Sequence, residues 1–180
     1  MSIAAQGATP FGLRIGMSRA EVEKLRGYKG PQAGQSLAFV TPPQPHPDFE
    51  SYGVVISPTQ GLCKVIAIGR DITLNSFGDQ LKTAFAETSR ALEEKYGKPQ
   101  VFDYVQSGSI WKEREDWAMS LAKEERTLAA MWEKPGSDLG GVLLESIASN
   151  SHTGYLRLSY ESPTFSACKD EVTKAQRSVF

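Results

Sequence analysis

Side chains that commonly act as general bases are scarce in this sequence. It has two histidines, His46 in a proline-rich stretch and His152 in a predicted turn. Both contexts favour exposed loops, where polar residues ordinarily lie. The sequence also lacks an HExxH zinc motif, a GxSxG nucleophile elbow, a phosphate-binding loop and a GxGxxG turn. We therefore predict no catalytic residue and no cofactor.

Carboxylates are the alternative source of acid–base chemistry, because burial can raise their pKa toward neutrality. The candidates are Asp103, Glu113, Glu115 and Asp116. Basic residues are interleaved with the last three, a pattern typical of a solvated helix face with surface ion pairs. An enzyme that uses acidic residues therefore stays an alternative to a non-enzymatic protein.

The two cysteines do not form a metal-binding pattern. Cys63 and Cys168 lie far apart and outside any CxxC motif, so we predict no metal site. Cys63 falls in an apolar run over 62–68, where a free cysteine behaves as a small buried hydrophobe. A disulfide would require Cα atoms within about 7 Å, and the sequence leaves open whether the two residues pair.

Composition indicates one ordinary globular domain over residues 1–180. Apolar residues make up 40% of the 180 residues, charged residues 23%, and the net charge is −1. Because acidic and basic residues are interleaved, we expect no nucleic-acid partner.

The sequence has no apolar stretch of the roughly 20 residues that a membrane span needs, and no signal-peptide pattern at its start. We therefore expect no membrane insertion and a cytoplasmic location. We also expect residues 1–10 to form a flexible segment. Small residues over 4–10 also resemble the start of a mature exported chain, so a periplasmic location after removal of a signal peptide is the alternative.

Hydrophobic periodicity and turn residues define the expected secondary structure. Five prolines forbid a helix over 31–47 and favour an exposed loop in its second half. The expected elements are, in chain order, a helix over 18–26, a strand over 37–40, strands over 49–57 and 62–69 joined by a turn, a long helix from 75 or 76 to 96, a helix over 112–125, strands over 127–133, 142–149 and 155–161, and a helix over 167–176.

This order favours an α+β fold. We expect an antiparallel sheet of about five to six strands, packed on one face by one long and one or two short helices. The repeated order of helix before strands also suggests two α-then-β halves, although sequence identity between them is faint.

The stretch Phe11–Val22 combines an apolar extended run, a glycine turn at Gly16-Met17 and a capping box from Ser18 to Glu21. This motif resembles the start of the α+β modules of BamE/SmpA-like outer-membrane-assembly lipoproteins and of β-lactamase-inhibitor-like proteins. The resemblance implies a small α+β fold and a non-enzymatic role through protein contacts. It does not imply a lipid anchor, because no cysteine lies near the start.

Aromatic residues are the candidates for contact with a partner protein. Trp111 follows a Gly-Ser-Ile stretch at a loop-to-helix junction, where an exposed indole would anchor an interface. Trp117 is a further candidate, with core packing as its alternative. Phe49 and Tyr52 follow the proline-rich loop, whose rigid backbone loses little entropy on docking.

We expect a non-enzymatic, bacterial protein-binding module, such as an inhibitor or immunity protein that neutralises a protein partner. An exported envelope accessory or structural protein is the first alternative, and the acidic-residue enzyme is the second.

Overall fold

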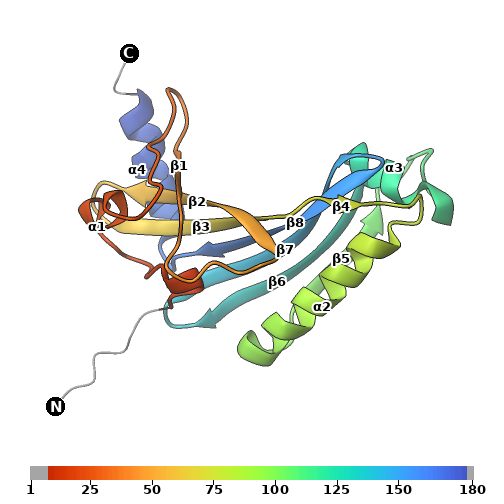
Figure 1. The fold of residues 1–180 in the computed structure, drawn as a ribbon, viewed down its shortest axis with the longest axis horizontal. Coiled ribbons are helices and arrows are strands. Elements are labelled where there is room, and N and C mark those ends of the chain that lie inside the picture. The colour runs from red at the N-terminus through yellow and green to blue at the C-terminus, as the bar shows by residue number, and fades with distance from the viewer. Residues whose placement is uncertain (1–7, 178–180) are drawn as a thin grey trace. The chain divides into compact units, whose positions relative to one another are not determined.

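The computed structural model describes residues 8–177 and shows an α+β fold with four α-helices and an antiparallel sheet of eight strands (Figure 1). The expected flexible segment 1–10 lies largely outside the described residues. The elements are, in chain order, η1 (Pro10–Gly12), α1 (Arg19–Glu23), β1 (Leu37–Val40), β2 (Phe49–Ser57), β3 (Gly61–Gly69), β4 (Ile72–Thr73), α2 (Asp79–Tyr96), β5 (Gln100–Val105), η2 (Arg114–Asp116), α3 (Trp117–Ala122), β6 (Arg126–Gly136), β7 (Leu139–Asn150), β8 (Thr153–Glu161) and α4 (Phe165–Arg177).

The strand order is β1-β2-β3-β8-β7-β6-β5, with β4 paired to β8 off this path. The α+β class is confirmed, but the expected five to six strands are too few because β4 and β5 were not predicted. β4 has only two residues. β5 carries no alternation of buried and exposed positions, so it lacks the pattern by which a half-buried strand is detected.

Residues cluster into two compact units that do not coincide with sequence halves. Unit 1 holds the chain up to Ala67, 134–141 and the chain from Ser159, and unit 2 holds 68–133 and 142–158. The α-then-β order recurs along the chain, with α1 before β1–β3 and α2 and α3 before β6–β8. The compact units nevertheless draw on both sequence halves.

Unit 1 begins with a tight turn in place of the extended run expected from Phe11. Phe11 has a φ of 55° inside η1, and its ring packs edge-on against Tyr52, Phe49 and Tyr160 at centroid distances of 4.9, 5.7 and 5.9 Å. The aromatic cluster explains the turn, because the left-handed backbone directs Phe11 into these rings. The expectation of a strand-like start is therefore wrong at this residue.

The predicted capping box is confirmed. The Ser18 hydroxyl accepts a hydrogen bond from the Glu21 N–H at 3.3 Å, and the Glu21 carboxylate accepts one from the Ser18 N–H at 2.8 Å. These bonds start α1 at Arg19, and the helix is shorter than the expected 18–26. Hydrogen bonds to Ser18 also hold the pKa of Glu21 below its ordinary value.

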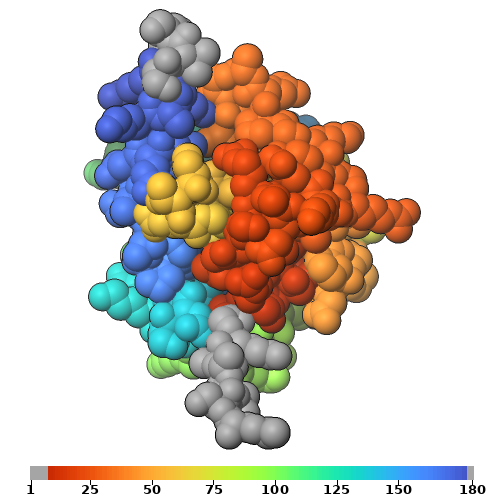
Figure 2. Space-filling model, turned by 90° about the vertical axis from the view of Figure 1, so that its left-hand side faces the viewer, coloured from red at the N-terminus to blue at the C-terminus, as the bar shows by residue number. Residues whose placement is uncertain are grey.

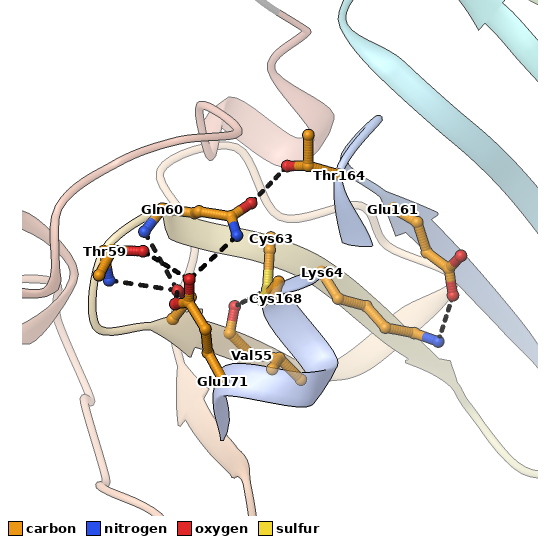
Figure 3. Close-up of a disulfide and its surroundings, with 10 residues drawn as sticks. Val55, Thr59, Gln60, Cys63, Lys64, Glu161, Thr164, Cys168 and Glu171 are labelled. Atoms are coloured by element: carbon orange, nitrogen blue, oxygen red, sulfur yellow. Dashed lines mark hydrogen bonds and ion pairs between the residues drawn. A yellow bond between two sulfur atoms is a disulfide. The ribbon is translucent and has the colours of Figure 1, made fainter. Parts of the chain in front are cut away.

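In unit 1 the terminal helix α4 is joined to the hairpin of β2 and β3. A disulfide links Cys63 in β3 to Cys168 in α4, with Cα atoms 6.5 Å apart and both side chains buried (Figure 3). The turn between β2 and β3, yellow in Figure 2, lies between α4 in blue and the N-terminal segment in red. The pairing that the sequence left open is therefore present.

Glu171 makes the second link between α4 and this turn. Its carboxylate accepts hydrogen bonds from the hydroxyls of Ser57 and Thr59, the latter at 2.7 Å, and from the Gln60 amide at 3.3 Å (Figure 3). These bonds, led by the one from Ser57, lower the pKa of Glu171 from 4.5 to about 2.

Unit 2 is built around the long helix α2. Its apolar stripe, Leu81, Phe85 and Leu92, is buried, as the spacing predicted. The helix ends at Gly97, whose carbonyl accepts a 2.6 Å hydrogen bond from the Trp132 indole. Trp132 thereby ties β6 to the end of α2.

The helix expected over 112–125 is shorter and interrupted. A 3-10 turn over Arg114–Asp116 precedes α3, and the backbone leaves the helical region at Glu124, where φ is 59°. The chain then enters β6 at Arg126. Of the charged residues at 113–116, Glu113 and Asp116 form a capping box at the 3-10 turn instead of lying on the face of a long helix.

Candidate protein-binding surface

The structure buries three of the four residues that the sequence proposed for partner contact. Phe49 and Tyr52 are 5% and 4% exposed within the aromatic cluster of unit 1, and Trp117 is 4% exposed. Their large apolar areas are already used in folding, so a contact role for them is corrected to core packing. Trp111 is half-buried and lines a surface hollow.

Trp117 is held by unit 2 from several sides. Lys82 and Arg126 lie over its ring at 4.7 and 5.8 Å from the centroid. Gly78, with a φ of 67°, lies so close beneath the ring that an added Cβ would overlap it. Burial is the main cause that lowers the pKa of Lys82. Trp117 is therefore a structural element of unit 2.

Exposed apolar side chains gather instead in one short segment of unit 2. Within residues 8–177, five large hydrophobic side chains are exposed, and three of them, Val101, Tyr104 and Ile110, fall in ten consecutive positions. Their exposed fractions are 56%, 53% and 76%. With Trp111 they form what we call the 101–111 surface. Concentrated exposed apolar residues of this kind mark interaction sites more often than isolated ones do.

The register of β5 and β6 identifies which backbone groups of β5 face outward. Gln100 lies opposite Met131 and Val105 opposite Arg126, and the next pair along joins the Gln106 N–H to the Glu125 carbonyl at 2.7 Å. Because hydrogen-bonded pairs alternate in an antiparallel ladder, the even-numbered residues of β5 bond to β6. The N–H and C=O groups of Val101, Asp103 and Val105 therefore point away from β6.

No other segment in the described part of the chain occupies this outer edge, because β5 is the last strand in the sheet order and no further backbone hydrogen bond there involves these three residues. The opposite edge strand, β1, differs. Phe39 in β1 exchanges two hydrogen bonds with Lys29, at 2.8 and 2.9 Å, and the Thr41 N–H bonds to the Arg26 carbonyl. The chain thus covers the β1 edge and leaves the β5 edge open.

The loop after β5 is fixed by hydrogen bonds. The Ser109 hydroxyl donates to the Glu125 carboxylate and accepts from the Trp111 N–H at 3.1 Å. The Gln106 amide donates to the Glu124 carbonyl at 3.1 Å. A hollow of about 350 Å³ is lined by 106–111 and Glu125. Such a pre-organised loop would lose little entropy on binding, while it presents Ile110 to solvent.

Charge on the 101–111 surface comes from Asp103. Its carboxylate lies 3.6 Å from the Arg126 guanidinium, and the Asp103 side chain is 59% exposed while that of Arg126 is 13% exposed. Arg126 also donates to the Ser120 hydroxyl at 2.9 Å. Val101, Asp103 and Val105 share one face of β5, because side chains alternate along a strand. This face therefore presents a carboxylate between two valines.

The other polar candidates serve local structure. Glu113 and Asp116 form a capping box at η2, and the His46 Nδ1 accepts the Asp48 N–H at 3.2 Å. His152 is exposed, and its Nδ1 lies 3.0 Å from the Ser151 hydroxyl. For residues 8–177, no group of three His, Cys, Asp or Glu side chains is arranged to hold a metal ion. No helix in that range is long and apolar enough to span a bilayer.

A second hollow, of about 370 Å³, lies in unit 1 between α4 and strands β1 to β3. Two lysines, Lys64 and Lys169, line it. Lys64 bonds to Glu161 at 2.7 Å (Figure 3). Its ammonium also lies 4.8 Å from the centre of the Phe165 ring. Nothing in the lining of this hollow specifies a ligand, so we assign none to it.

The sequence located Trp111 at this surface but missed β5 and its valines. The pattern QVFDYV is rich in β-branched and aromatic residues, which is the signal that could have indicated the strand. Comparison of the chain with protein-family models, with curated proteins and with solved structures finds no match.

Proposed function

We propose that this chain is a non-enzymatic protein-binding module that contacts a partner protein through the 101–111 surface. The observation that carries the proposal is the concentration of exposed Val101, Tyr104 and Ile110 beside the open edge of β5. Val101 and Tyr104 lie on opposite faces of β5 and so flank this edge from both sides. Aromatic residues are enriched at protein interfaces. An inhibitor or immunity role, in which binding blocks the partner, fits the resemblance of the opening motif.

Paired pull-downs from lysate of the source organism test this proposal. The wild-type chain is compared with a Tyr104→Ser/Ile110→Ser variant, and with Phe77→Ser as the matched control. Phe77 is also exposed in unit 2, at 40%, but lies outside the 101–111 surface. We expect a protein that the wild type and the Phe77 variant retain and the double variant loses. Equal recovery by all three proteins would contradict the proposal.

An exported accessory or structural role is the second candidate. The disulfide between Cys63 and Cys168 favours it, because structural disulfides persist mainly in oxidising compartments. The gene sequence upstream of residue 1 tests this role. An encoded signal peptide would support export, whereas a native translation start at Met1 would count against it.

A further inference from the structure

We propose that the partner adds an extended segment to the open edge of β5 and so extends the sheet by one strand. This inference rests on the proposed function and specifies its mode of binding. Three residues with outward N–H and C=O groups, Val101, Asp103 and Val105, recur at every second position. This spacing matches the backbone of another strand, which is the basis of strand addition.

The edge carries few of the devices by which edge strands usually avoid pairing. Natural edge strands are blunted by charged side chains, especially lysine, by proline or by a bulge, or are covered by another segment. The six residues of β5 include one charge, Asp103, but no lysine and no proline, and their register with β6 is regular throughout. The β1 edge shows that this chain does cover an edge elsewhere, by its bridge between Lys29 and Phe39.

Side chains on the two faces of β5 define the chemistry of the added segment. On one face Val101 and Val105 flank Asp103, whose side chain stays 59% exposed although its carboxylate lies 3.6 Å from the Arg126 guanidinium. A partner strand would place its alternate side chains beside these three, so we infer an apolar-x-basic-x-apolar pattern in which a lysine or arginine faces Asp103. On the other face Tyr104 offers an exposed ring to the intervening positions.

The same charge argues against a second copy of this chain as the occupant. If two β5 strands paired about a two-fold axis so that all three outward residues found partners, Asp103 would lie directly opposite its own copy. Like charges opposed across a strand pair are destabilising. A heterologous segment with a basic residue meets no such repulsion.

Selection of linear peptides from a random phage-displayed library on the immobilised full chain tests this mode. Binding of the selected synthetic peptides is then measured to the wild type, to Val101→Pro and to Val101→Thr. Proline at 101 removes an outward N–H but no bond to β6, and threonine keeps that N–H on a β-branched side chain. Circular dichroism verifies that both variants fold.

We expect the selected peptides to share the apolar-x-basic-x-apolar pattern and to bind Val101→Pro about tenfold more weakly than Val101→Thr, because one backbone hydrogen bond is lost. Asp103→Lys should weaken binding of the same peptides relative to the wild type. A selection on this variant should favour peptides with an acidic residue at the centre. Strand addition by a heterologous segment is overturned if no such peptides are enriched, if they bind both Val101 variants equally, or if sedimentation shows a dimer that Val101→Pro dissociates. A pull-down that still depends on Tyr104 and Ile110 would then leave the proposed function intact.

Discussion

Loss of the disulfide between Cys63 and Cys168 should lower the stability of this protein substantially. The bond closes a loop with a sequence separation of 105 residues. A disulfide that closes a loop of about 100 residues reduces the entropy of the unfolded chain by an amount worth about 4.7 kcal/mol. Typical domains have a free energy of unfolding of about 5–15 kcal/mol, so the bond could contribute a third or more of the total.

Urea denaturation of the oxidised protein, the reduced protein and Cys63→Ala/Cys168→Ala measures this effect. We expect a free energy of unfolding about 4–5 kcal/mol lower for both forms that lack the bond. Far-UV circular dichroism follows the whole chain, and tryptophan fluorescence follows unit 2, which contains all three tryptophans. A fluorescence transition that does not move while the dichroism transition does would mean that the two units unfold separately.

Two results would refute the reasoning about the disulfide. One is a difference of less than about 1 kcal/mol between oxidised and reduced protein, which would show that the loop constrains the unfolded chain far less than its length implies. The other is alkylation of both cysteines in denatured protein that has not been reduced, since this would show that the bond is absent.

Three further predictions test other parts of the structure. Glu171→Gln should lower the melting temperature near neutral pH and flatten its fall in acid. The reason is that a carboxyl pKa lowered from 4.5 to about 2 gives stability that is complete above pH 4.5 and is lost as the pH falls through 2. Equal profiles of melting temperature against pH for the variant and the wild type would contradict this prediction. Gly78→Ala should lower the free energy of unfolding, measured by urea denaturation, by about 2–4 kcal/mol. The added Cβ would overlap the Trp117 ring, and the backbone φ at residue 78 is positive. A change below about 0.5 kcal/mol would show that the ring moves freely aside. Trp111→Ala should weaken partner binding by about 2 kcal/mol in calorimetry with little loss of stability, and a fall in stability alone would place Trp111 in the core.

Sequence reasoning located most elements because their apolar periodicity is strong. The buried stripe of α2 and the largely alternating burial of β7 and β8 follow patterns typical of a helix and of strands. The Ser18 cap was likewise detectable, because its hydrogen bonds are local. These features depend on residues close together in the sequence.

Features that depend on distant residues were not detectable in the same way. Whether Cys63 and Cys168 pair depends on how α4 packs on the sheet, where it contacts β2, over a separation of 105 residues. Phe49 and Tyr52 are buried in a cluster with Phe11, whose left-handed turn the sequence did not indicate. The edge position of β5 depends on the strand order of the whole sheet, and no local pattern records that order.

Site-specific photo-crosslinking tests the central claim most directly. A photoreactive amino acid replaces Ile110 in the 101–111 surface, and a control chain carries it at Glu87, which is exposed on α2 in the same unit. After irradiation in cells of the source organism, we expect one protein to be captured from position 110 and not from position 87. Capture of the same proteins from both positions, or of none from position 110, would contradict a partner-binding role for this surface.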